Sequence, residues 1–281
     1  MNAQDYACKA ESVFVLPEVV IKIKGLIDDD AASMQEIAEL INYDPAVMSR
    51  VLKISNSALY SFPSEVSTVS KAIQVMGTAA VYDLVLAYGV ANAFKGMDGK
   101  VIDVDRFWDQ SVSCALLARY FAEELSFKEP ERLFVCGLLH NIGELVVVQF
   151  SPEIAKKCEM TTNECSQLQL QMEHLGFSYA EVGAKLLRLW GIPSAISEPI
   201  ARQHISLTKA ETVDDHILQL AYILALINAS EEDNQRYSDI SAELYESLEI
   251  DPDCLERAMN FTNLQLMGAL ALFNPAIFTA L

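Results

Sequence analysis

Apolar residues recur at steps of three and four along most of the chain, which is the spacing of one face of an α-helix. Residues that favour helix ends divide this pattern into segments. Ser33 and Glu36 have the spacing of a capping box, and Asp44 stands before a proline, as an N-cap often does. Ser67 and Thr78 are each expected to cap a further helix. The pattern therefore predicts about five short, closely spaced helices in the first hundred residues.

The helical pattern continues toward the C-terminus, without the alternation of apolar and polar residues that is typical of a strand. The longer segments are 107–125, 132–150, 178–190, 193–204 and 217–229. Two or three closing helices are expected between residues 241 and 281. The predicted fold class is therefore all-α.

The charge of the chain limits its partners. It carries 39 acidic and 20 basic side chains, so its formal net charge is −19. Such a surface repels phosphates, and we expect neither nucleic acid nor a membrane as a direct partner. The apolar runs at 84–93 and 218–227 are broken before the roughly 20 residues of a membrane span. With no secretory signal and no CxxC pair among six cysteines, a cytoplasmic protein is expected.

One polar pair interrupts an apolar helix. His140 and Asn141 lie within the run GLLHNIG, and burying an imidazole beside an amide requires hydrogen-bond partners. The pair is either a core feature that ties helices together or a remnant or working ligand site. Glu144 follows one turn after His140, and we expect an exposed or capping carboxylate there.

The run at 136–147, which contains this pair, resembles the central motif of the HD superfamily of metal-dependent phosphohydrolases. In that motif a histidine followed by aspartate binds a divalent metal. The wider sequence resembles the HDOD (HD-related output) domain of bacterial signalling proteins over roughly residues 12–210. The segments that carry this resemblance are 16–18 (LPE), 41–45 (INYDP), 51–57 (VLKISNS), 107–108 with Ser111, 175–176 with 182–184, 190–193 (WGIP) and 203–204.

The resemblance also implies where metal ligands would be. A hydrolytic HD site uses histidines and aspartates to polarise phosphate and activate water. This chain keeps His140 and, further on, His204. Neutral residues occupy the other positions where the family's enzymes have donors: Gln110, Asn141, Tyr179 and Tyr222. Two imidazoles do not hold magnesium or manganese, which prefer oxygen ligands, so we expect no cofactor, with adventitious zinc or nickel as the alternative.

The function implied by the resemblance is a non-catalytic bacterial signalling module. It would bind a signalling protein or a small ligand in the groove where a phosphohydrolase holds its metals. The alternative is a divergent metal-dependent phosphohydrolase that acts on a nucleotide or phosphodiester. A third interpretation is a scaffold without a pocket.

The chain also shows a joint between subdomains. Glycines and charges at 94–105 break the helical periodicity, which places a boundary near residue 100. We predict an N-terminal short-helix bundle (12–100) packed on an HD-like helical core (101–210), followed by a C-terminal helical extension (211–281).

Overall fold

The computed structural model is helical throughout the residues it describes. These are residues 1–28, 33–97, 101–161, 165–205, 212–229 and 240–273. No strand occurs within these ranges, and the all-α prediction is confirmed.

Contacts divide the chain into two compact units. Unit 1 comprises residues 1–14 and 96–263, and unit 2 comprises residues 15–95 and 264–281. The predicted boundaries at residues 100 and 210 lie outside the described residues. Helix α14 (Val213–Ala229) packs against α7 (Val104–Glu124) inside unit 1.

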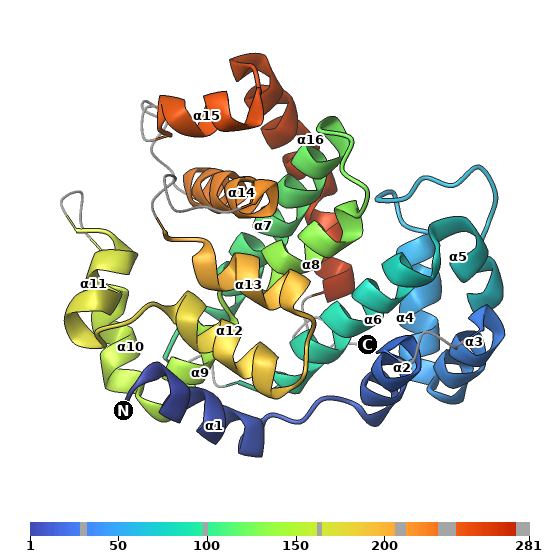
Figure 1. The fold of residues 1–281 in the computed structure, drawn as a ribbon, viewed down its shortest axis with the longest axis horizontal. Coiled ribbons are helices and arrows are strands. Elements are labelled where there is room, and N and C mark those ends of the chain that lie inside the picture. The colour runs from blue at the N-terminus through green and yellow to red at the C-terminus, as the bar shows by residue number, and fades with distance from the viewer. Residues whose placement is uncertain (29–32, 98–100, 162–164, 206–211, 230–239, 274–281) are drawn as a thin grey trace. The chain divides into compact units, whose positions relative to one another are not determined.

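Unit 2 contains the short helices predicted near the N-terminus (Figure 1). They are α2 (Glu18–Asp28), α3 (Met34–Tyr43), α4 (Pro45–Ser55), α5 (Val69–Met76) and α6 (Thr78–Ala93). Their buried face consists of aliphatic side chains, among them Ile23, Ile41, Ile54 and Ile73. Helix α1 (Ala3–Val13) precedes them in unit 1, so the first hundred residues hold six described helices rather than about five.

The predicted caps of unit 2 are partly right. Ser33 forms the expected capping box with Glu36, and the Asp44 side chain accepts hydrogen bonds from the first turn of α4. The α5 cap is Thr68 rather than Ser67. Gly77, with φ +89°, occupies the N-cap position of α6, and Thr78 is already inside that helix. A glycine fits this turn because the left-handed region has no steric penalty without a Cβ.

Unit 1 surrounds α7, the long helix against which α8 and α14 pack (Figure 1). Its other helices are α8 (Pro130–Leu139), α9 (Ile142–Phe150), α10 (Pro152–Cys158), α11 (Gln167–His174), α12 (Tyr179–Leu189), α13 (Ser194–Arg202) and α15 (Ala242–Leu248). Helix α16 (Pro252–Phe273) begins in unit 1 and ends in unit 2. Helix α1 packs on α12, and the Tyr6 hydroxyl lies 2.6 Å from that of Ser151.

The single helix predicted at 132–150 is divided. Helix α8 ends at Leu139 and α9 begins at Ile142, so His140 and Asn141 form the junction. Taken together, residues 130–150 are long and apolar enough to cross a membrane, which the sequence reasoning overlooked. This stretch is 89% buried inside the fold, as expected for the core of a globular domain.

Candidate functional site

The junction between α8 and α9 is held by close backbone packing on both sides. A Cβ added at Gly137 would lie 2.6 Å from Cα of Ala115 on α7. A Cβ at Gly143 would overlap the carbonyl oxygen of Tyr179, the first residue of α12. Glycine is therefore required at both positions, since any side chain would separate the helices. The run GLLHNIG thus fixes His140 and Asn141 in the interior between α7 and α12.

His140 and His204 come together around one aromatic ring. His140 is 1% exposed, and its ring centroid lies 5.5 Å from that of Tyr222 on α14. His204 lies two residues after Arg202, the last residue of α13, and its ring centroid lies 5.0 Å from that of the same tyrosine. Both contacts are edge-to-face. Three of the six predicted residues therefore converge, although they come from three different helical segments.

Gln203 completes this group, which we call the imidazole cluster (His140, Gln203, His204 and Tyr222). Its side chain is 3% exposed. The Gln203 amide nitrogen donates to the carbonyl oxygen of His140 at 3.4 Å and lies 3.1 Å from Nε2 of His204. Gln203 belongs to one of the family-like segments, but it was not among the predicted site residues.

Burial keeps both imidazoles uncharged at neutral pH. It lowers the pKa of His140 to about 4, although a hydrogen bond to the carbonyl of Gly137 acts in the opposite direction. Burial and the neighbouring His140 lower the pKa of His204 to about 4 as well. The pKa of the buried Tyr222 hydroxyl is raised above its usual range for the same reason. The cluster is therefore polar but carries no charge.

Asn141 and Glu144 form a second pair beside the cluster. The Asn141 amide donates to a carboxylate oxygen of Glu144. Glu144 is only 4% exposed, so the expectation of an exposed carboxylate is wrong. The sequence did hold a signal, because Glu144 is the only charged residue in an α9 segment that is apolar on all sides. A helix of that kind is buried around its whole circumference.

The environment of Glu144 disfavours its charged form. Burial and the neighbouring Glu159 raise its pKa to about 7, against the opposing effects of Arg106 and the Asn141 amide. The side chain therefore titrates near neutral pH. It is a buried acid that the sequence reasoning placed at the surface.

Among the described residues, no hydrogen bond or ring contact joins Tyr179 or Gln110 to the imidazole cluster. Tyr179 is 1% exposed, and its backbone N–H donates to the side-chain oxygen of Gln171. Gln110 is half-buried on α7 and, within the described part of the chain, makes no hydrogen bond to the other predicted residues. His174 and His216, expected at the surface, are half-buried on α11 and α14.

The donor set does not fit the metal centre that an HD hydrolase requires. Among the residues described, no three His, Cys, Asp or Glu side chains are grouped so that they could hold a metal ion. The amide nitrogen of Asn141 donates to the carboxylate of Glu144. His140 directs Nδ1 at the carbonyl of Gly137. No hydrolytic step through a metal can be derived from these side chains.

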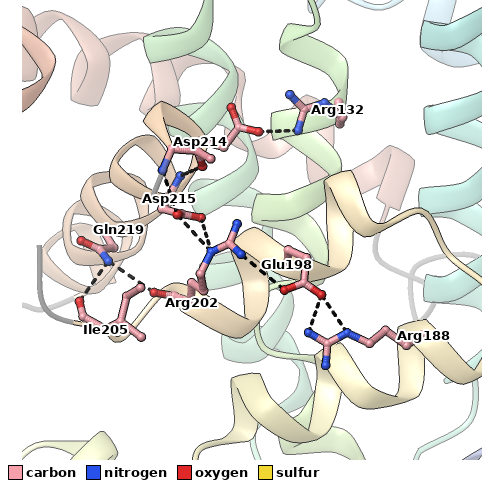
Figure 2. Close-up of polar contacts among 9 residues, drawn as sticks. Arg132, Arg188, Glu198, Arg202, Ile205, Asp214, Asp215 and Gln219 are labelled. Carbon is pink, nitrogen blue, oxygen red and sulfur yellow. Dashed lines mark hydrogen bonds and ion pairs between the residues drawn. The ribbon is translucent and has the colours of Figure 1, made fainter. Parts of the chain in front are cut away.

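Charged side chains are concentrated instead between α8, α12, α13 and α14, in a group we call the ion-pair network (Figure 2). Its members are Arg132, Arg188, Glu198, Arg202, Asp214 and Asp215. Asp215 is 0% exposed, and Nε of Arg202 bonds its two carboxylate oxygens at 3.1 and 3.0 Å. Arg132 donates to Asp214 at 2.7 Å and to the carbonyl of Ala195 at 2.8 Å.

This network positions the imidazole cluster. Gln203 and His204 immediately follow Arg202, whose side chain is fixed by Asp215. The Gln219 amide also donates to the carbonyl oxygens of Arg202 and Ile205, at 3.3 and 3.1 Å (Figure 2). The end of α13 is thereby attached to α14, the helix that carries Tyr222.

Comparisons with known proteins agree with this fold. The family profile of the HDOD domain matches residues 13–206. A protein of Treponema pallidum (strain Nichols) is 26% identical over 211 residues, which cover 72% of this chain but only 39% of that protein.

Solved structures share the fold at low sequence identity. A candidate phosphohydrolase of Shewanella amazonensis SB2B has a TM-score of 0.74 at 23% identity, with 97% of each chain covered. A candidate signal transduction protein of Marinobacter aquaeolei VT8 has a TM-score of 0.68 at 19% identity, covering 97% of this chain and 65% of that one. An HDOD domain protein of Geobacter sulfurreducens has a TM-score of 0.66 at 20% identity, with 98% and 96% covered. At these identities the likeness shows the fold alone.

Proposed function

Since this chain belongs to the HDOD domain family, we propose that it is a non-catalytic signalling module of the cytoplasm. It binds a signalling protein or a small ligand through the degenerate HD site around His140. It does not contact nucleic acid or a membrane directly, because its net charge of −19 repels their phosphates. The whole protein's partners are part of this proposal.

One observation carries the proposal. The polar side chains around His140 bond one another and backbone groups rather than converge on a shared point where an ion could bind. Asn141 donates to Glu144, His140 bonds the carbonyl of Gly137, and the Gln203 amide nitrogen lies against His204. Hydrolysis of a phosphodiester needs an ion that polarises phosphate and acidifies water. The neutral imidazoles, amide and phenol of the imidazole cluster supply no charge, and the neighbouring carboxylate, Glu144, already accepts from Asn141.

Metal content and turnover test the proposal directly. The full chain is purified without chelators, its metal content is measured, and it is then incubated with magnesium, manganese or zinc and a panel of nucleotides and phosphodiesters. We expect substoichiometric metal and no turnover above that of His140→Ala. Stoichiometric metal together with turnover lost in His140→Ala would instead establish the divergent phosphohydrolase.

Binding is the second readout. A module that takes a ligand is stabilised by it, so its melting temperature rises in the presence of that ligand. A scaffold without a pocket would melt at the same temperature with every compound. Substitutions at His140 or Tyr222 would not weaken its binding to a partner protein.

A further inference from the structure

The imidazole cluster has a defined set of hydrogen-bond donors and acceptors. Nδ1 of His140 lies 2.7 Å from the carbonyl oxygen of Gly137, which can only accept, so Nδ1 carries the proton. Nε2 of His140 is therefore an acceptor. The Gln203 amide nitrogen faces the carbonyl of His140 and Nε2 of His204, so His204 accepts at Nε2 and carries its proton on Nδ1.

This assignment leaves one buried acceptor without a donor. The side-chain oxygen of Gln203 has no hydrogen-bond partner among the described residues, although the side chain is 3% exposed. Rotating the amide would not remove the mismatch, because it would place that oxygen against the carbonyl of His140. A buried acceptor without a donor costs about 1–3 kcal/mol, so such groups in folded proteins usually meet a bound water or ligand.

Two arginines on the helices that carry the cluster are already paired with carboxylates. The arginine on α8, Arg132, bonds Asp214, and the arginine at the end of α13, Arg202, bonds Asp215. Phosphate recognition in proteins relies on such cations or on backbone N–H groups. What the cluster offers is two acceptors, Nε2 of His140 and the oxygen of Gln203, beside the aromatic ring of Tyr222.

We propose that the imidazole cluster binds an uncharged small molecule whose N–H groups donate hydrogen bonds, such as a planar carboxamide, and that it rejects phosphates and carboxylates. The orphan oxygen of Gln203 accepts one of these hydrogen bonds. This inference rests on the proposed function, because it names the chemical class of ligand for the same non-catalytic site.

Benzamide and benzoate are matched probes for this inference. They have the same size and shape, but the amide donates two hydrogen bonds whereas the carboxylate only accepts. The chain has only four histidines, so their imidazole signals can be followed by NMR during a titration of the full chain. We expect benzamide to move the signals of His140 and His204, with a Kd on the order of 1 mM. His174 and His216 lie outside the cluster and should not respond.

Two variants locate the effect. Gln203→Met keeps the length of the side chain but removes the acceptor, and we expect roughly tenfold weaker benzamide binding, as for one lost hydrogen bond. Gln171→Met is the matched control, because Gln171 is a buried amide on α11 that accepts from the backbone N–H of Tyr179 and, among the described residues, has no hydrogen bond to the cluster. Its benzamide affinity should be unchanged. Circular dichroism of both variants establishes that they are folded.

Each other outcome has a distinct meaning. Benzoate or inorganic phosphate binding as well as benzamide, without turnover, would overturn the ligand class and leave the proposed function intact. Benzamide binding that is equal in Gln203→Met, or no response to benzamide at millimolar concentration, would also overturn the inference. Metal-dependent turnover at this site would overturn the proposed function itself.

Discussion

The ion-pair network and the imidazole cluster are built from the same helices but in opposite ways. Both use α8, α13 and α14, and both bury polar side chains in unit 1. The network buries Asp215 completely and supplies Arg202 as its partner. The cluster buries His140 to a similar degree and surrounds it with the neutral side chains of Tyr222 and Gln203.

The difference shows that burial alone does not explain the absence of charge in the imidazole cluster. This fold accommodates the buried carboxylate of Asp215 because Arg202 bonds it. Arg202 stands immediately before Gln203 and His204 in the sequence. A buried ion needs a partner within hydrogen-bond distance, or it becomes neutral. The absence of charge in the cluster is therefore a property of its own residues.

The largest expected effect comes from breaking the network. Arg202→Ala leaves Asp215 buried without its cation, and we expect a loss of about 3–5 kcal/mol in the free energy of unfolding, measured by urea denaturation. The NMR signals of His204 should shift as well, because the end of α13 loses its attachment. A loss below about 1 kcal/mol would mean that the network does not hold α13.

The pH dependence of stability tests whether the two histidines of the imidazole cluster are uncharged in the folded chain. The folded pKa of His140 and of His204 is about 4, below the usual 6.5 of the unfolded chain. Between these values the unfolded chain binds protons that the folded chain does not, so stability rises with pH, by up to about 3 kcal/mol for a buried histidine. We expect this rise in urea denaturation from pH 4 to 6.5.

Glu144 should oppose that rise. Its folded pKa of about 7 lies above the usual 4.5, so stability contributed by its protonated form is lost as pH increases through this range. The rise should therefore be steeper in Glu144→Gln and shallower in His140→Gln than in the parent chain. Parallel curves for the three proteins would contradict the assignment of charge states.

Asn141→Asp introduces a carboxylate next to the imidazole cluster. It restores the residue of hydrolytic HD motifs but faces the Glu144 carboxylate, which now accepts from the Asn141 amide. We expect a loss of about 2 kcal/mol at pH 8 and a smaller loss at pH 5, where a shared proton joins the two carboxyl groups. The measurement is urea denaturation at both values. A variant as stable as the parent at pH 8 would show that Glu144 is not the partner of this position.

The smallest effect is expected at the exposed end of the network. Arg188 donates to Glu198 at 2.7 Å, but their side chains are 42% and 37% exposed. Arg188→Ala should therefore cost no more than about 1 kcal/mol, and less in high salt. It is the control for Arg202→Ala, since both remove an arginine from the same network. Equal losses in the two variants would mean that burial does not decide the value of these ion pairs.

Much of the fold was accessible from the sequence because helix signals are local. The capping box of Ser33 and Glu36 and the N-cap Asp44 act within one turn, and the structure confirms them. The family-like motifs also named His140, His204 and Tyr222, three residues that the structure brings together. The misplaced caps, Ser67 and Thr78, are errors of a single position. At α5 the neighbouring hydroxyls of Ser67 and Thr68 compete for the same N-terminal N–H groups, whereas at α6 the N-cap position is taken by Gly77, which has no side chain.

The sequence by itself determined an all-helical chain and, through the family resemblance, the positions where hydrolytic HD domains carry metal donors. Tertiary structure alone decided that Glu144 is buried against Asn141, that Gln203 joins the two histidines, and that Arg202 meets Asp215 thirteen residues away. Helical spacing tells which residues share a face. Whether a polar side chain on that face is buried, and what it meets there, depends on the other helices that cover it.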